Sequence, residues 1–253
     1  MRDDTGAEVP LAEPPRRIVS LVPSLTEAVA ATGADLLAGA TDWCTHPAGL
    51  DVPRVGGTKW PRLEAVLACR PDLVLANREE NRPEDLAALR AAGVPVWVTG
   101  PATVAAALDS LGRMLAACGL ADPEPAWLAA ARREWAEPAL PWCTAVVPIW
   151  RKPWMVLGRD TFAGDVLRLL GVANAYAGHA ERYPRVPLEE LRAAGADLVV
   201  LPDEPYRFTA ADGPGFFPGT RCALVSGRHL TWYGPSLAEA GTVLAGQLGR
   251  PAP

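Results

Sequence analysis

The sequence predicts an α/β protein of two doubly wound lobes that are related by an internal repeat. Two observations predict this class. Short apolar runs alternate with helix-like segments along the chain, a pattern typical of parallel strands covered by helices on both faces. A block of sequence also recurs at a spacing of 125 residues, close to half of the 253-residue chain.

The repeated block contains a short helix followed by a buried strand. Leu63-Glu64 opens the first copy, which leads to a strand at 72–76, and Leu188-Glu189 opens the second, which leads to a strand at 197–201. Helix starts and strand starts are each 125 residues apart, and an aromatic-Pro-Arg triplet precedes both copies. A block in register at half the chain length indicates two related lobes.

Apolar runs without helical periodicity are predicted to be strands. Four of these runs lie in the first half of the chain and three in the second half. They are 18–22, 36–41, 73–76, 94–98, 145–149, 198–201 and 223–225.

Helix signals fall between these strands. Ser24 and Glu27 have the spacing of a capping box, which predicts a helix with Ser24 as its N-cap residue. Pro83 and Gly93 suit the first helical position and the C′ position of another helix. Residues 123–137 are rich in strong helix formers, and we expect a single helix there to join the lobes. The predicted N-terminal lobe is 14–120, the connecting helix 121–138 and the C-terminal lobe 139–253, with a ligand cleft between the lobes.

Composition narrows the class of protein. The net charge is −5 with scattered Lys and Arg, which argues against nucleic acid or an anionic membrane as the partner. No apolar run approaches the roughly 20 residues of a membrane span. The polar, acidic start at Met1 lacks an export signal, so a chain complete from Met1 is expected to stay in the cytoplasm with reduced thiols. Five widely spaced cysteines without a C-x-x-C pair are expected to be small core residues rather than disulfides or zinc ligands.

Aromatic residues cluster directly after predicted strands, where open α/β sheets bind their ligands. They are Trp43, Trp60, Trp150, Trp154, Trp232 and Tyr233. Each could cap the core beneath it, but so many at one topological level favour a cleft that stacks on a bulky ring-bearing ligand. Arg151 and Lys152 would suit an anionic group of that ligand, or they are solvated surface cations.

Other chemistry is less well supported. His46 lies two residues from Cys44 without further metal ligands nearby in the sequence. His179 and His229 are isolated, and we expect them to be solvated loop residues. The sequence contains neither a G-x-S-x-G nor an H-E-x-x-H motif. No catalytic residue, resident cofactor or metal site is predicted, and the protein is expected not to be an enzyme.

The chain resembles the substrate-binding proteins of cobalamin and ferric-siderophore ABC importers, the type with a helical backbone between the lobes. The segments that carry the resemblance are 16–27, 70–76, 150–155 and 232–235, and the match extends from about Pro14 to Leu248. The vitamin B12-binding subgroup is the most similar. The resemblance implies a ligand held by aromatic residues of both lobes, and by position these are Trp43, Trp60, Trp150 and Trp232, with Trp154 and Tyr233 as support.

The resemblance also implies an extracytoplasmic location and docking on a membrane permease through one carboxylate per lobe. Glu64 matches the first carboxylate. The second falls near Gly234, which carries no charge, and Glu189 is a substitute by its place in the repeat.

The function expected from the sequence is capture of a corrinoid such as cobalamin, by a monomer, for ABC-type import. A ferric-siderophore or haem binder on the same scaffold is one alternative. A cytosolic tetrapyrrole carrier or a chelatase-like enzyme is another, and the enzyme would need a histidine and a carboxylate that converge in the cleft.

Overall fold

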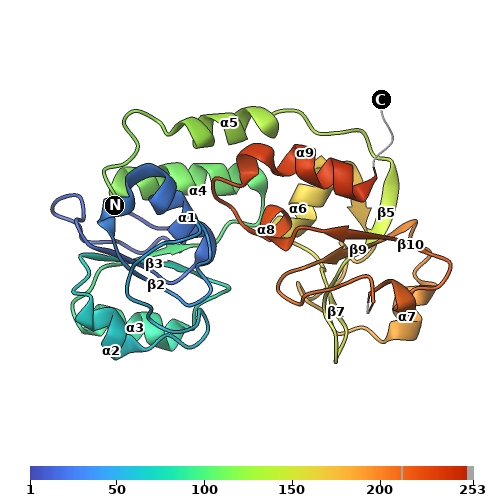
Figure 1. Cartoon of the computed structure of the whole chain (residues 1–253), viewed down its shortest axis with the longest axis horizontal. Coiled ribbons are helices and arrows are strands. Elements are labelled where there is room, and N and C mark those ends of the chain that lie inside the picture. Colours follow the sequence, from blue (N-terminus) through green and yellow to red (C-terminus); the bar gives the residue numbers. More distant parts are fainter. Residues whose placement is uncertain (212, 250–253) are drawn as a thin grey trace. The chain divides into compact units, whose positions relative to one another are not determined.

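The computed structural model describes residues 1–211 and 213–249, which form two compact units, each built on a four-stranded parallel sheet (Figure 1). The first unit comprises Met1–Pro101, Ala106–Ala130 and Tyr233–Pro235, and the second comprises Ala102–Ala105, Ala131–Trp232 and the chain from Ser236 onward. The predicted α/β class is confirmed. The predicted lobe limits remain a prediction, which this division into units does not test. Residues 212 and 250–253, which belong to the predicted C-terminal lobe, lie outside the described residues.

The sheet of the first unit has the order β2-β1-β3-β4, with β1 at Ile18–Ser20, β2 at Leu37–Ala40, β3 at Leu73–Asn77 and β4 at Val96–Thr99. Helices α1 (Pro23–Gly33) and α4 (Val104–Ala117) lie on one face, and α2 (Leu63–Ala68) and α3 (Pro83–Ala91) on the other (Figure 1). A 3-10 turn at Ala34–Leu36 leads into β2.

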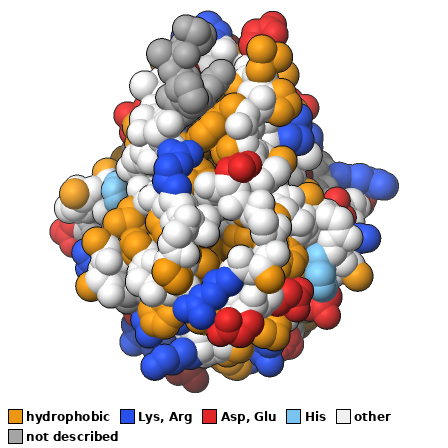
Figure 2. Space-filling model, turned by 90° about the vertical axis from the view of Figure 1, so that its right-hand side faces the viewer, with side chains coloured by type: hydrophobic (Ala, Val, Ile, Leu, Met, Phe, Trp, Pro, Cys, Tyr) orange, Lys and Arg blue, Asp and Glu red, His pale blue; other side chains and the backbone are white. Residues whose placement is uncertain are grey.

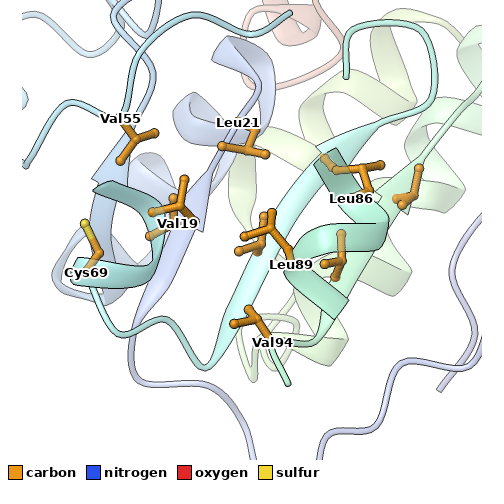
Figure 3. Packing of buried hydrophobic residues seen from close by; sticks show 12 residues of the cluster. Val19, Leu21, Val55, Cys69, Leu86, Leu89 and Val94 are labelled. Carbon is orange, nitrogen blue, oxygen red and sulfur yellow. The ribbon is translucent and has the colours of Figure 1, made fainter. Parts of the chain in front are cut away.

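Buried aliphatic side chains fill the space between this sheet and the helices α2 and α3, as Figure 3 shows. Val19 and Leu21 come from β1 and its end, and Leu86 and Leu89 come from α3. All four are at most 5% exposed. This packing holds the strand ends, and the loops that leave them, in place.

The sheet of the second unit has the order β10-β9-β5-β8, with β5 at Cys143–Val146, β8 at Val172–Asn174, β9 at Leu198–Pro202 and β10 at Arg221–Val225. Strands β6 (Pro148–Trp150) and β7 (Met155–Val156) form a separate antiparallel ribbon. The remaining elements are α5 (Ala126–Glu134), α6 (Phe162–Leu169), α7 (Leu188–Ala193), a 3-10 turn at Pro214–Phe216, α8 (Gly227–Thr231) and α9 (Leu237–Leu248). Helix α5 carries the boundary between the units, since Ala130 is assigned to the first and Ala131 to the second.

The internal repeat is confirmed by the topology. When β5, β8, β9 and β10 take the places of β1, β2, β3 and β4, both sheets have the same strand order. Three of these strand pairs and the helix pair α2 and α7 start 125 residues apart. Asp72 and Asp197 also have equivalent roles, because each accepts backbone hydrogen bonds at the start of the first strand of its sheet. Asp72 accepts from the N–H groups of Arg16 and Arg17, and Asp197 accepts from the N–H of Thr144. The bonds from Thr144 lower the pKa of Asp197.

The capping box predicted at Ser24 is wrong. Helix α1 begins at Pro23, its N-cap is Val22, and no side chain caps it. Proline has its φ preset for the first helical position and lacks the N–H that would need a partner there, so the N-cap lies two residues earlier than the predicted one at Ser24. Ser24 and Glu27 are consequently buried inside the helix.

Two further details of the second half differ from the prediction. The strand expected at 145–149 is divided, since β5 ends at Val146 and β6 begins at Pro148, a residue that cannot donate to a ladder. Two elements were not predicted from the sequence: β8, which has only three residues, and α6, whose N-cap Thr161 accepts a hydrogen bond from the Gly164 N–H.

The cysteines are free thiols. Cys44, Cys69 and Cys118 are buried, as expected of small core residues, whereas Cys143 and Cys222 are half-buried. Burial raises the pKa of Cys118 to about 12, so this thiol stays protonated near neutral pH. No helix among the described residues is long and apolar enough to cross a bilayer. On the face shown in Figure 2, acidic and basic side chains are interspersed rather than gathered in one patch.

Candidate functional site

Two tryptophans of the first unit stand on loops beyond β2 with most of their surface exposed. Trp43 is 66% exposed and Trp60 is 69% exposed. The Trp60 loop is a tight turn closed by a bridge between Gly56 and Pro61, and Gly56 has a φ of +93°, a conformation that favours glycine. The Trp43 indole borders the same loop, because a Cβ at Gly57 would lie 3.6 Å from its Nε1.

Arg54 fixes the loop that carries Trp43. Its Nη1 donates to the carbonyls of Thr41 and Cys44, both at 2.9 Å, and its Nη2 donates to the carbonyl of Leu50 at 3.0 Å. One guanidinium therefore ties three points of the loop together. Arg54 was not predicted from the sequence, since nothing in the local pattern separates it from a surface arginine.

The Trp60 ring has a cation against one face. The guanidinium carbon of Arg82 lies 3.9 Å from the ring centroid. On the neighbouring segment, Lys59 donates to the carbonyl of Glu79. Removal from water raises the pKa of the Glu80 carboxyl, Lys59 opposes this shift, and Glu79 adds to it. The exposed indole therefore has the Arg82 guanidinium on one face, and the lysine that precedes it in the sequence is bound to the segment of Glu79.

Trp150 is the exposed tryptophan of the second unit, at 43%. Its ring meets Tyr206 edge to face, with centroids 5.6 Å apart, and the Arg151 guanidinium lies 4.2 Å from the centroid of Phe216. Trp154 instead packs into an aromatic cluster with Phe208, Phe216 and Phe217, at centroid distances of 6.0, 5.4 and 5.6 Å. Tyr206 was not among the residues predicted from the sequence, although it lies in the loop that follows β9.

Trp232 and Tyr233 are both buried, at 8% and 7% exposure. Trp232 Nε1 donates to Glu204 Oε2 at 2.9 Å. The Tyr233 hydroxyl bonds Thr99 Oγ1 at 2.8 Å and accepts from Asn77 Nδ2, and burial raises the pKa of this phenol. Neither ring presents an open face as Trp43, Trp60 and Trp150 do.

The two carboxylates expected to dock on a permease occupy equivalent, exposed places. Glu64 lies in the first turn of α2, and Glu189 lies in the first turn of α7, where it pairs with Arg192 at 3.1 Å. A side chain at position 234 is excluded sterically, because a Cβ at Gly234 would lie 2.9 Å from the carbonyl oxygen of Ser24.

The expectation that His229 is a solvated loop residue is wrong. It lies in α8 with its side chain 13% exposed. Its Nδ1 is 2.8 Å from Ser226 Oγ, and its Nε2 is 3.2 Å from Glu239 Oε1. These contacts join the start of α8 to α9. Among the described residues, no three His, Cys, Asp or Glu side chains gather as metal ligands would.

Replacing Glu204 by glutamine should stabilise the protein near neutral pH. Burial raises the pKa of Glu204, Trp232 opposes the shift by its hydrogen bond, Asp203 adds to it, and Arg228 opposes it. The folded state then holds the proton more tightly than the unfolded chain. The free energy of unfolding therefore falls as the pH rises from the ordinary pKa of glutamate to the raised one. Glutamine carries no charge and still accepts from Trp232.

The test measures urea unfolding of Glu204→Gln and of the unchanged protein at two pH values. One is about pH 4, near the ordinary pKa of glutamate, and the other is about pH 7, well above that pKa. The stabilisation should be present at the higher pH and absent at the lower one. Glu13→Gln, at an exposed site, is the matched control. An equal difference at both pH values would contradict the assignment of the effect to the buried charge.

Comparisons with known proteins give a consistent picture. No family model matches the chain. It is 28% identical over 189 residues to a vitamin B12-binding protein of Vibrio cholerae, which covers 70% of this chain and 67% of that protein. The solved structure of the periplasmic haem-binding protein BhuT in complex with two haems matches with a TM-score of 0.77 at 27% identity, over 93% of this chain and 98% of that one. The periplasmic vitamin B12 binding protein BtuF of Vibrio cholerae matches with a TM-score of 0.73 at 21% identity, over 93% and 97%.

These findings confirm the resemblance that the sequence motifs indicated. The chain is similar in sequence to vitamin B12-binding proteins and in fold to periplasmic proteins named for binding vitamin B12 or haem. All of these relatives are named as binding proteins rather than as enzymes.

Proposed function

We propose that this relative of the vitamin B12-binding proteins is itself a substrate-binding protein, which captures a corrinoid such as cobalamin as a monomer and delivers it to an ABC-type importer. A binding role is supported by both the sequence relatives and the solved structures. The corrinoid is the finer proposal, and it rests on the names of the sequence relatives together with the aromatic residues at the strand ends.

The observation that carries the proposal is the exposure of three tryptophans at equivalent levels of a repeated fold. Trp43, Trp60 and Trp150 are 66%, 69% and 43% exposed; Trp43 and Trp60 follow β2, and Trp150 is the last residue of β6, after β5. Leaving large aromatic faces in water is unfavourable unless a partner covers them, and indole rings stack well on flat conjugated systems. We therefore assign these three residues to direct contact with the ring system of the ligand.

The other selected residues take supporting roles in this proposal. Trp154 forms the aromatic base behind Trp150 and Arg151, and Arg151 faces an anionic edge of the ligand. Trp232 and Tyr233 hold the chain in place through Glu204, Asn77 and Thr99 rather than by stacking on the ligand. Glu64 and Glu189 are the proposed contacts with the permease.

Haem is the second candidate, favoured by the match to the haem complex of BhuT. Haem iron takes an axial ligand from the protein, often a tyrosine or histidine, whereas cobalamin brings axial ligands of its own. Tyr233 does not suit that task, since its hydroxyl is engaged with Asn77 and Thr99 and its pKa is raised. This observation argues against Tyr233 as the axial ligand of a haem, and it leaves Tyr206, which lies against Trp150, as a tyrosine near the proposed contact residues.

The experiment is a parallel titration with cyanocobalamin, haemin and a ferric siderophore, followed by tryptophan fluorescence and by calorimetry. We expect saturable quenching and heat with cyanocobalamin at micromolar concentration or below. Tight binding of haemin alone would move the assignment to a haem binder. Absence of binding with all three would refute the ligand class.

A further inference from the structure

Arg82 makes a contact with Trp60 that the general stacking proposal does not explain. The guanidinium lies over the indole at 3.9 Å from the ring centroid, although Trp60 is 69% exposed. A cation at this distance over a tryptophan face is attracted by the ring quadrupole. One face of the ring is thus covered by the protein itself, and the exposed surface belongs to the remainder of the ring.

The orientation of this guanidinium is fixed by carboxylates. Arg82 Nε donates to Asp85 Oδ2 at 2.8 Å, and Nη2 donates to Asp85 Oδ1 at 2.7 Å, which is a bidentate pair. Nη1 lies 3.3 Å from Glu84 Oε1. The Asp85 side chain is only 8% exposed, so the anchor of the pair is part of the packed first unit.

The backbone on both sides of the contact is also constrained. Arg82 is the N-cap residue of α3, and Pro83 follows it at the first helical position. The Trp60 loop is closed by the bridge between Gly56 and Pro61. The remaining freedom in this contact is therefore that of the Arg82 and Trp60 side chains, and each side chain restricts the other.

We propose that Arg82, held by Asp85, positions the Trp60 ring before the ligand arrives, a role that rests on the proposed function. An exposed tryptophan on a loop loses rotamer freedom when a ligand stacks on it, and that loss opposes binding. A ring already held against Arg82 loses less. Arg82 and Asp85 are positioning residues, and Trp60 is the residue that contacts the ligand.

Direct recognition of an anionic ligand group by Arg82 is the competing role. It is disfavoured because Nε, Nη1 and Nη2 all face carboxylates of Asp85 and Glu84. Asp85 takes one N–H of Nε and one of Nη2, so a carboxylate or phosphate of the ligand would have to compete with Glu84 for the remaining donors. Arg82 packs on Trp60 with the flat face of its guanidinium, which needs no hydrogen-bond partner.

The first test needs no ligand. Nitrogen-15 labelling of the tryptophan indoles gives one N–H signal per ring, and Trp60→Phe identifies the signal of Trp60. Arg82→Met should shift that signal and increase the fast motion of the ring. Arg168→Met is the matched control, since Arg168 also pairs with an aspartate three residues away, Asp165, but lies over no aromatic ring of the described residues. An unmoved Trp60 signal overturns the proposal, whatever ligand the protein binds.

The second test measures affinity for whichever of the three probes binds. Arg82→Met should weaken binding about threefold, the effect expected from an exposed cation–π contact. Arg82→Lys keeps the charge but not the planar guanidinium, so its affinity should lie between those of the unchanged protein and Arg82→Met. This variant replaces Arg82→Met in the test if the methionine variant folds poorly. In a Trp60→Ala background, Arg82→Met should cause no further loss. An equal loss in that background would show that Arg82 contacts the ligand directly and would overturn the positioning role.

Discussion

Replacing Trp60 by alanine should weaken ligand binding about tenfold or more and leave the thermal midpoint of unfolding almost unchanged. Stacking of an aromatic ring contributes roughly 1 kcal/mol beyond the area that it buries, and a tenfold change corresponds to about 1.4 kcal/mol. The side chain is 69% exposed in the free protein, so its loss removes little of the core. Fluorescence or calorimetric titration measures the affinity, and circular dichroism measures the midpoint.

The matched control is Trp142→Ala. Trp142 directly precedes β5, at the end of the sheet opposite to the loops that carry the selected tryptophans, and it bonds the carbonyl of Leu170. Its replacement should leave affinity unchanged even if stability falls. A Trp60→Ala variant that binds as tightly as the unchanged protein would show that the exposed indole has another purpose.

Replacing Tyr233 by alanine should lower the free energy of unfolding by about 3 to 5 kcal/mol, the range for removal of a large buried aromatic side chain. Tyr233 is 7% exposed and hydrogen-bonded to Asn77 and Thr99. Tyr233→Phe keeps the packing and removes only the hydroxyl. Its expected loss is about 1 kcal/mol, because Asn77 and Thr99 retain bonds to the Thr99 and Ala76 carbonyls.

Urea unfolding of both variants measures these losses, with the half-buried Tyr183 replaced by alanine as the control for a tyrosine outside the core. Tyr183→Ala should cost well under half as much as Tyr233→Ala. A loss below about 1 kcal/mol for Tyr233→Ala would contradict the packing role, since burial alone predicts more.

The repeat, the sheet class and the level of the aromatic residues could be predicted from the sequence. Buried parallel strands are apolar on both faces, so short runs such as 73–76 and 198–201 indicate their structure locally. The equal spacing of the two copies then fixed which strands correspond. The same rule led to Trp43, Trp60 and Trp150, because open α/β sheets bind ligands at the loops after their parallel strands; their part in binding stays a prediction, and Trp150 lies at the end of the antiparallel strand β6.

The direction of each aromatic side chain could not be predicted in the same way. Trp232 and Tyr233 were expected to follow the last strand, but the helix α8 comes between, Trp232 is its C-cap residue, and both side chains are buried. Their partners are Glu204, which is 28 residues earlier, and Asn77, which is 156 residues earlier. A side chain chooses its rotamer by contacts that form only after the chain has folded, so position after a strand gives the level of a residue but not its exposure.

The assignment of Tyr233–Pro235 to the first unit has a consequence for how this protein could be divided or recombined. A fragment that ends at Ala130 would contain the sheet of the first unit but not the tyrosine that packs against Asn77 and Thr99. A chimaera that takes its second half from a relative would have to bring a matching tripeptide for a site made by the first half. The two copies of the repeat are thus not interchangeable. A substitution at Asn77 limits the residues that fit at position 233, and the reverse also holds, although 156 residues separate the two positions.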